Sequence, residues 1–467
     1  MTQAHEPLLG NVAVRRRRMR REVVTIRRKR RTRFHPRPWM IPAAFALVIG
    51  LGASVLSLPI ASESGEWTNG VDSLFTSVSA VCVTGLVRFD TAEHWSFFGE
   101  MTIAVLIQVG GLGVTMYAGA LLLIFGNRLG LRGREFFGME LMDTTERDIL
   151  RLLRRVMIFA FGIELATFLL LLPWFWLDVP GGNAVWKSLF HSISAFNNAG
   201  FDLQGGLRSF TEEMDDPYPI AVMGVAAFMG SMSFITVFNM NQLPRGWTLD
   251  TKLVVIGMVM LLFVGMGLFM LAEQGDGRIL AGMNPIEQLV NSFFLSVNRT
   301  TGMSTVDMGL VQDSTMTALL LLMFIGGAST STSGGIKVGA FMVSMVVVLS
   351  ALRGQHRASI FGRDIPQAIV VRAIAVPVLG FFTLCLGILL LELTDDLEFL
   401  PLMFEVMSGL ANVGWSQSIT PQMSQAGTLI MSALMFAGRL GSLYIALSIP
   451  DKPRTRYRFP EAGVRIG

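Results

Sequence analysis

Four stretches of the chain align without gaps on one glycine, and this alignment decides the fold. They read SLFTSVSAVCVTGL (residues 73–86), SLFHSISAFNNAGF (188–201), VNSFFLSVNRTTGM (290–303) and LMFEVMSGLANVGW (402–415). The aligned glycines are Gly85, Gly200, Gly302 and Gly414, and a serine precedes each of them by six residues. The glycines are 115, 102 and 112 residues apart, so the chain contains four copies of one unit.

Long apolar runs flank every copy. The chain has 467 residues, of which 52% are hydrophobic and only 15% charged, whereas soluble domains have about 25% charged residues. Eight runs are long enough to cross a bilayer, which takes about 20 residues. They lie near residues 38–60, 100–125, 152–177, 218–240, 252–272, 314–350, 367–394 and 426–449. The aligned stretches are too short to span, and each ends in a polar loop, which indicates a re-entrant hairpin.

We therefore predict an all-α membrane protein with four tandem helix–pore loop–helix repeats around a pseudo-fourfold central pore. It has eight transmembrane helices and four re-entrant pore helices in this interpretation. The repeats are assigned to residues 38–125, 152–240, 252–350 and 367–449, with filter loops near 82–86, 197–201, 299–303 and 411–415. Cytoplasmic tails are assigned to residues 1–37 and 450–467.

The distribution of charge predicts the orientation in the membrane. The formal net charge is only +4, but the segments that carry the hairpins hold five Lys/Arg and 20 Asp/Glu. The opposite face with the tails holds 31 Lys/Arg and 11 Asp/Glu, so the positive-inside rule places both termini in the cytoplasm. The hairpins then enter from outside, where Asp90 and Asp307 either concentrate cations or are simply solvated loop charges.

The N-terminal tail is strongly basic, with twelve Lys/Arg in residues 15–33. A basic run beside a membrane span indicates contact with anionic lipid headgroups and an anchor for the orientation. Nucleic-acid binding is the less economical interpretation of the same charges, and we expect none.

Four re-entrant helices that enter from one side can build a cation pathway. Each short helix directs its partially negative C-terminal end toward the pore centre, and four such ends favour a cation there. The loop that follows can turn its backbone carbonyls inward and replace the hydration shell of an ion. Glycine at the same place in each copy permits the backbone angles that such a loop needs. Close helix packing through small residues is the alternative explanation for the glycines.

These loops resemble the four filter loops of the Trk/Ktr/HKT superfamily of potassium transporters, and the resemblance covers residues 38–450. The residues at the filter positions are Val83, Thr84, Gly85, Asn198, Ala199, Gly200, Thr300, Thr301, Gly302, Asn412, Val413 and Gly414. Eight spans without an additional N-terminal pair are most similar to the Ktr-type channel-like membrane subunit. The resemblance implies potassium uptake across the cell membrane through a single-file pore in each protomer, with potassium bound in the filter.

The resemblance also implies partners and a preference among cations. Ktr-type subunits form homodimers on a cytosolic RCK-type (KtrA-like) regulatory ring that binds ATP or ADP, and we expect no nucleotide site on this chain. Gly85 favours potassium, because some relatives with serine at this place pass sodium more readily. Transport of sodium, or of sodium coupled to potassium, by a member of the same superfamily is the alternative.

The sixth apolar run contains GGASTSTSGGIK at residues 326–337. Glycines and hydroxyl side chains make a poor helix interior, so we predict an unwound intramembrane loop beneath the third filter. The resemblance implies that this loop gates the pore. Its residues are Gly326, Gly327, Ser329, Thr330, Ser331, Thr332, Ser333, Gly334, Gly335 and Lys337. A tight helix contact through small residues is the alternative.

Arg439 lies in the eighth apolar run, where a charge is costly and indicates function by default. The resemblance places an arginine at this position in the pore near the gating loop, where it adds an electrostatic barrier. A snorkelling or paired structural arginine is the alternative.

Catalysis finds little support in the sequence. The five histidines show no metal-ligand spacing, and two cysteines exclude a disulfide scaffold or a cysteine-rich metal site. We therefore expect no enzyme. An alternating-access secondary transporter is a competing class, although such folds usually show two inverted halves rather than four parallel repeats.

Overall fold

The computed structural model describes residues 40–125, 146–178, 181–241, 243–275, 278–355 and 357–448. The predicted cytoplasmic tails, with the proposed lipid contact, lie outside the described residues. Contacts divide the chain into Met1–His35 and Pro36–Gly467, and every described residue belongs to the second unit.

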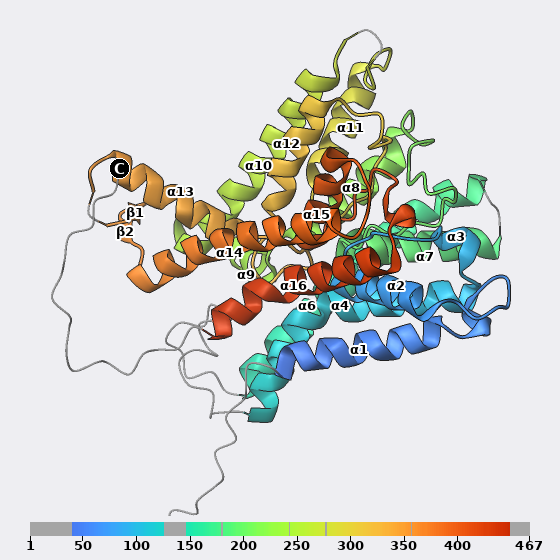
Figure 1. Ribbon diagram of the computed structural model, residues 1–467. Helices are drawn as coiled ribbons and strands as arrows, with labels where there is room; N and C mark the ends of the chain where they lie inside the picture. The colour runs from blue at the N-terminus through green and yellow to red at the C-terminus, as the bar shows by residue number, and fades with distance from the viewer. Residues whose placement is uncertain are drawn as a thin grey trace, which may run out of the picture. The chain divides into compact units, whose positions relative to one another are not determined.

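Helices account for nearly all regular structure in the described part of the chain (Figure 1). The helices of the flanking apolar runs are α1 Met40–Leu56, α4 Phe97–Phe125, α6 Glu146–Asp178, α8 Pro217–Ser231, α10 Leu249–Glu273, α12 Asp313–Phe324, α13 Val338–Leu352, α14 Gln367–Glu392 and α16 Gln425–Ser448. The aligned stretches form α2 Gly70–Cys82, α7 Gly182–Asn197, α11 Pro285–Asn298 and α15 Phe399–Ala411. The remaining elements are α3 Thr91–His94, α9 Phe234–Met240, η1 Pro59–Ala61, η3 Pro244–Gly246, η4 Thr420–Gln422, β1 Ser359–Ile360 and β2 Arg363–Asp364.

Two of the four helices that contain the aligned stretches begin with a side-chain cap. The Asn69 side chain accepts a hydrogen bond from the backbone N–H of Val71 at the start of α2. Asn284 and Glu287 form a reciprocal capping box at the start of α11. Each of the four then packs among helices of the flanking apolar runs: α2 against α1, α4 and α16; α7 against α4, α6 and α8; α11 against α8 and α10; α15 against α12, α14 and α16. Their C-terminal ends are thereby held inside the helical assembly.

In the described part of the chain, three helical segments are long and apolar enough to cross a membrane: Leu150–Asp178, Leu249–Glu273 and Gln367–Glu392. The bent pair α8 and α9 counts as a fourth span if it is taken as one. Of the other predicted spans, the sixth is divided into the short helices α12 and α13, and α1 has only 17 residues, whereas α4 has 29 and α16 has 24. Only 17% of the apolar window of α14 is buried, so its outer surface is suited to lipid contact.

The structure corrects one expectation. The fourth apolar run, interpreted as a single span, is bent by 98° between α8 and α9. Ser233 caps the new helix at this bend, accepting a hydrogen bond from the backbone N–H of Thr236. The mostly helical fold is confirmed, and the described residues also contain the short antiparallel pair of β1 and β2, with Ser359 opposite Asp364. In the sixth run, no helix is present between Phe324 and Val338.

Candidate functional site

The backbone leaves three of the four aligned helices in the same way. The residue after α2, α7 and α15 is left-handed, with φ of 57° at Val83, 58° at Asn198 and 53° at Asn412. In each case the next backbone N–H groups bond carbonyls of the last helical turn, as in a Schellman motif. The chain therefore turns sharply at each helix end. The residue after α11 differs, because Arg299 stays right-handed with φ −53°.

The recurring serine of each stretch fastens its loop to its own helix in three copies. Ser79 Oγ accepts a hydrogen bond from the N–H of Gly85 at 3.1 Å. Ser408 Oγ accepts one from Gly414 at 3.0 Å in the same manner. Ser194 Oγ instead donates to the carbonyl of Phe201 at 2.6 Å. These contacts hold the glycine at a fixed distance beyond the helix end.

The four aligned glycines form a closed ring. All four have positive φ, with values of +95°, +76°, +82° and +107° in chain order. A Cβ atom on any of them would lie within 3.0 Å of the backbone carbonyl that precedes the glycine of the next copy. The pairs are Gly85 with Ala199, Gly200 with Thr301, Gly302 with Val413, and Gly414 with Thr84. The fourth copy thus contacts the first, and a side chain at any of these positions would displace the neighbouring carbonyl.

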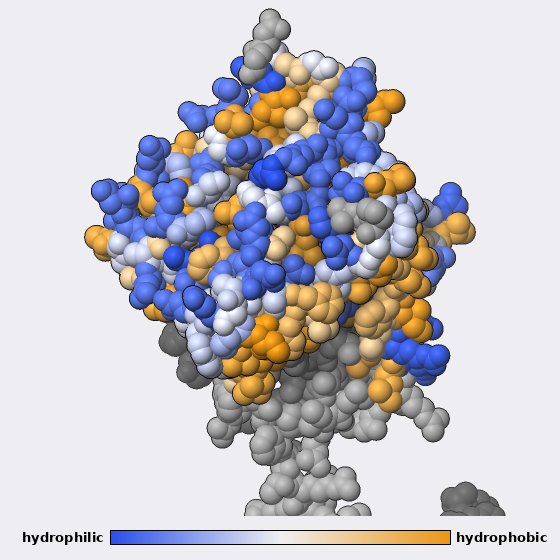
Figure 2. All heavy atoms as spheres, turned by 90° about the vertical axis from the view of Figure 1, so that its right-hand side faces the viewer, coloured by the Kyte–Doolittle hydropathy of each residue, from blue (hydrophilic) through white to orange (hydrophobic). Residues whose placement is uncertain are grey.

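A cavity of about 370 Å³ lies on one side of this ring and reaches all four glycines. Its lining includes the carboxylate-bearing residues Asp90, Asp202 and Asp307 together with polar groups such as Ser209. Figure 2 shows the face of the molecule that carries these loops, and hydrophilic residues cover much of it. The predicted outer aspartates Asp90 and Asp307 therefore lie at the mouth of the ring. Asp202 had not been predicted there.

Asp202 gives this mouth a pH-dependent charge. Burial, and then the nearby charges of Asp90 and Glu213, raise its pKa to about 7. The carboxyl is therefore neutral below pH 7 and negatively charged above it. We expect the apparent affinity for an external cation to weaken by roughly threefold as external pH falls from about 8 to about 6. Asp202→Asn should abolish this dependence, as measured by uptake at subsaturating cation concentration.

Asp307→Asn is the matched control for the pH experiment. It removes another carboxylate from the cavity but leaves Asp202 in place. The variant should bind cations more weakly and still respond to pH across the same interval. A pH response that disappears in Asp307→Asn and persists in Asp202→Asn would refute the assignment.

The loop of residues 325–337 lies on the other side of the ring. Its backbone is paired with the bend between α8 and α9, because Ala328 N–H bonds the Ser231 carbonyl at 3.0 Å and Thr332 N–H bonds that of Gly230 at 3.2 Å. The side chain of Asn198 donates to Thr332 Oγ1 at 2.8 Å. Gly334 packs directly against Asn412. The loop of residues 325–337 therefore contacts the ring loops that follow α7 and α15, on the side away from the acidic cavity.

Three cationic side chains fasten this loop. Arg439 is only 5% exposed, and its guanidinium donates to the carbonyls of Thr332 and Gly110. Arg299 is 3% exposed and donates to the carbonyls of Ile325 and Gly326. Lys337 Nζ donates to the Ser333 carbonyl at 2.6 Å. These cationic groups donate hydrogen bonds to loop carbonyls that no longer have a partner within a helix.

The structure thus brings together the loop residues, Lys337 and Arg439, which the sequence had also singled out. The sequence analysis missed the contribution of the α8–α9 bend, although the small polar run GSMS at 230–233 signals a break in an apolar segment. In the described part of the chain, no group of three or more His, Cys, Asp or Glu is placed to hold a metal ion.

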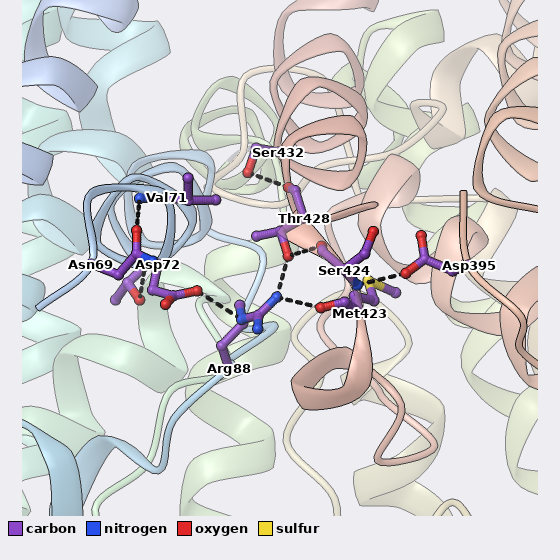
Figure 3. A network of polar contacts seen from close by, with 10 residues as sticks. Asn69, Val71, Asp72, Arg88, Asp395, Met423, Ser424, Thr428 and Ser432 are labelled. Atoms are coloured by element: carbon purple, nitrogen blue, oxygen red, sulfur yellow. Dashed lines mark hydrogen bonds and ion pairs between the residues drawn. The ribbon is translucent and has the colours of Figure 1, made fainter. Parts of the chain in front are cut away.

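A polar network joins the first and fourth copies near the mouth (Figure 3). Arg88, three residues after Gly85, pairs its Nε with Asp72 Oδ1 at 2.8 Å. Its Nη1 donates to the Met423 carbonyl at 2.9 Å and to Thr428 Oγ1. The side chains of Arg88 and Asp72 are only 15% and 13% exposed. The network therefore holds α2 and the loop after it to the start of α16.

We expect Arg88→Gln to destabilise the protein. The variant removes an ion pair and charged hydrogen bonds that are largely shielded from solvent, each such bond contributing about 1.5–3 kcal/mol. Thermal unfolding in detergent should show a clear loss of stability. Arg208→Gln is the control, because the Arg208–Glu212 pair is 52% and 67% exposed and should contribute little. Equal losses in the two variants would contradict the importance of the network.

A closed ring of glycines and backbone carbonyls beside an acidic cavity, set among helices with outward apolar surfaces, suits a membrane transport protein for small cations. The family comparison agrees with this class. The model of the TrkH family, described as cation transport protein, matches residues 29–453. The chain belongs to this family. Its members are transporters embedded in the membrane, and the prediction that the chain is not an enzyme is confirmed.

Individual relatives extend this result. The Ktr system potassium uptake protein B of Bacillus subtilis is 34% identical over 93% of this chain and 97% of its own length. The potassium/sodium uptake protein NtpJ of Enterococcus hirae is 32% identical over 95% of this chain and 100% of its own length. The structure is similar to the crystal structure of the potassium transporter TrkH from Vibrio parahaemolyticus, with TM-score 0.67, 17% identity, and 91% and 86% of the two chains covered. This last likeness supports the helical fold.

Proposed function

We propose that this protein takes up potassium through a single-file, channel-like pathway whose selectivity filter is the glycine ring. The observation that carries the proposal is the closure of the ring, in which each glycine adjoins the carbonyl before the next. Carbonyl oxygens so arranged can replace the water molecules of a cation's hydration shell. Potassium is then the ion held between Val83-Thr84-Gly85 and its three counterparts.

The proposal includes the architecture predicted from the sequence. Four helix–pore loop–helix repeats surround the pathway, with eight spans and four re-entrant helices, α2, α7, α11 and α15. Both termini lie in the cytoplasm of a cell whose plasma or inner membrane holds the protein. The acidic cavity then faces outside, where Asp90, Asp202 and Asp307 attract cations before they enter the ring.

We place the gate in the loop of residues 325–337 with Arg439. This loop lies against the ring loops that follow α7 and α15, on the side of the ring away from the acidic cavity. The buried Arg439 guanidinium adds a positive charge there and bonds a loop carbonyl. Withdrawal of the loop would lengthen or break these bonds and open a path to the cytoplasm.

Regulation is assigned to partners. Three relatives carry the name of a Ktr system, which supports a multi-component assembly for this chain as well. We infer a homodimer that rests on a cytosolic RCK-type ring, with ATP or ADP bound by the ring. The basic N-terminal tail is assigned to anionic lipid.

Potassium is favoured over sodium because all four ring positions are glycine. The Enterococcus relative is named for both ions, which keeps sodium as the competing substrate. An alternating-access mechanism is less consistent with a closed ring of four copies than with two inverted halves.

Potassium uptake by cells that lack their own uptake systems tests the proposal. Cells that express the protein should grow at low external potassium and accumulate it, and a variant of the ring glycine Gly302→Asp at equal membrane expression should not. Growth rescue that needs sodium uptake without potassium accumulation would overturn the proposed substrate.

A further inference from the structure

Two asparagines occupy the same place in the second and fourth loops of the ring. Asn198 and Asn412 each follow their helix in a left-handed conformation, and both side chains are fully buried. Asparagine tolerates this conformation well. However, Val83 has the same left-handed backbone at the matching place in the first loop. Backbone conformation alone therefore does not explain an amide here, and a buried amide needs hydrogen-bond partners.

The Asn198 side chain links its own loop to the third one. Its Oδ1 accepts a hydrogen bond from Thr301 Oγ1 at 2.7 Å and another from Thr300 Oγ1 at 3.1 Å. Its Nδ2 donates to Thr332 of the loop below the ring at 2.8 Å. Both ends of the amide are thus engaged, and Asn198 spans the junction between the second and third copies.

The Asn412 side chain links the fourth copy to the first with the opposite polarity, because its amide nitrogen is the donor and its Oδ1 has no hydrogen-bond partner among the described residues. Its Nδ2 donates to Thr84 Oγ1 at 3.0 Å and to the Met435 carbonyl at 2.8 Å. Thr84 and Thr301 hold matching positions, each directly before a ring glycine. The two asparagines therefore bond matching threonines across alternate junctions of a four-membered ring.

The two remaining junctions lack this arrangement. The residues that precede Gly200 and Gly414 are Ala199 and Val413, which have no hydroxyl group to bond. The pattern alternates around the ring: asparagine in the even copies, threonine in the odd copies. The braced junctions are thus the opposite pair, two to three and four to one.

The braces fix the carbonyl groups at those junctions. The carbonyl of Thr301 is the one that adjoins Gly200, and the carbonyl of Thr84 is the one that adjoins Gly414. A hydrogen bond to the side chain of each threonine limits how far its own carbonyl can move. Cation selectivity depends on the position and number of such oxygens.

We propose that the Asn198–Thr301 and Asn412–Thr84 hydrogen bonds set the width of the ring and thereby determine its preference for potassium over sodium. This inference rests on the proposed function of the ring as a potassium filter. The two asparagines act as positioning residues in it, because they act through the threonines whose carbonyls face the ion. Loss of either brace lets the ring contract around the smaller sodium ion.

A double-mutant cycle on ion selectivity tests the braces. Asn198→Leu and Thr301→Val remove the two partners of one brace, and Asn412→Leu and Thr84→Val those of the other. The readout is the ratio of potassium to sodium flux in proteoliposomes. Each single variant should lower this ratio by about fivefold, the factor expected for the loss of one typical hydrogen bond.

The cycle has a control built into the ring. Asn198→Leu combined with Thr301→Val should lower the flux ratio no further than Asn198→Leu alone, because both substitutions remove the same hydrogen bond. Asn198→Leu combined with Thr84→Val disrupts two different braces, so its losses should multiply. Multiplicative losses in both combinations would show that the residues act separately and would overturn the inference, as would direct ligation of the ion by threonine independent of asparagine.

Serine variants protect the test against misfolding. Thr84→Ser and Thr301→Ser keep the hydroxyl group and should retain the wild-type ratio, whereas the nearly isosteric valine variants should not. Unchanged selectivity in both valine variants refutes the braces even if the asparagine variants do not fold. A selective wild type with unaffected valine variants contradicts the braces alone, whereas a wild type without potassium preference contradicts the proposed function and the braces with it.

Discussion

Gly85→Ser is expected to lower the preference for potassium over sodium by about tenfold or more, a change that corresponds to at least about 1.4 kcal/mol in relative ion free energy. A Cβ at this position would lie 2.6 Å from the Ala199 carbonyl and 3.0 Å from the Gly200 Cα. Those atoms belong to the neighbouring copy, so the substitution displaces the carbonyl ring rather than a flexible side chain. A displaced ring no longer matches the larger unhydrated ion.

Gly65→Ser is the control that isolates this clash. Gly65 also has a positive φ, of +70°, but no atom lies within 4 Å of its Cβ position. Both variants therefore suffer the backbone cost of a non-glycine residue at positive φ, about 1–2 kcal/mol, and only one of them disturbs the ring. The relative uptake of potassium and sodium at equal expression is the measurement. If Gly85→Ser leaves that ratio unchanged, the ring is not the filter.

Arg439→Ala is expected to raise basal cation flux by about tenfold, which corresponds to the loss of about 1.4 kcal/mol from the barrier. The buried guanidinium both repels a cation and fastens the loop, through its bond to the Thr332 carbonyl. Its removal relieves the electrostatic barrier and frees one attachment of the loop. Flux through the purified wild type and variant in proteoliposomes measures the change.

Arg439→Lys separates the two contributions of the arginine. Lysine keeps the positive charge but cannot reproduce both hydrogen bonds, to Thr332 and to Gly110, with the same planar geometry. Low flux in Arg439→Lys would assign the effect to charge, and high flux would assign it to the attachment of the loop. Equal or lower flux in Arg439→Ala would contradict the barrier itself.

The glycine positions were predictable because the chain repeats the same local chemistry four times. Helix, serine, turn and glycine recur in the same order, and the ring needs little more than that local geometry. The break in the sixth run was predictable for a similar reason, since glycines and hydroxyl side chains are concentrated in twelve residues. Both features depend on backbone conformation, which sequence encodes locally.

The remaining features depend on contacts between distant parts of the chain. Nothing near Asn198 in the sequence points to Thr301 or Thr332, which are over 100 residues away and make its hydrogen bonds. The raised pKa of Asp202 likewise depends in part on Asp90, which is more than 100 residues away in the chain. The bend between α8 and α9 was missed because the short polar run at 230–233 lies inside a mostly apolar segment.

The third copy shows how a repeat can diverge while the ring is retained. Thr300 occupies the position of the left-handed residue of the other copies but does not have a positive φ, and Arg299 just before it keeps a right-handed backbone. The Arg299 side chain turns to the carbonyls of Ile325 and Gly326, so this copy attaches the loop below the ring. Gly302 nevertheless has φ +82° and adjoins the Val413 carbonyl, as the pattern requires. An alignment finds the shared glycine but not the new task of its neighbour.

The glycine ring is proposed to be the filter of a potassium pathway. Flux through the purified protein in proteoliposomes, under imposed potassium and sodium gradients, tests it most directly. We expect an electrodiffusive flux that reverses near the potassium equilibrium potential. In Gly85→Ser this flux should lose its preference for potassium over sodium. A saturable exchange strictly coupled to a second ion, or a reversal potential that follows sodium in the wild type, would contradict it.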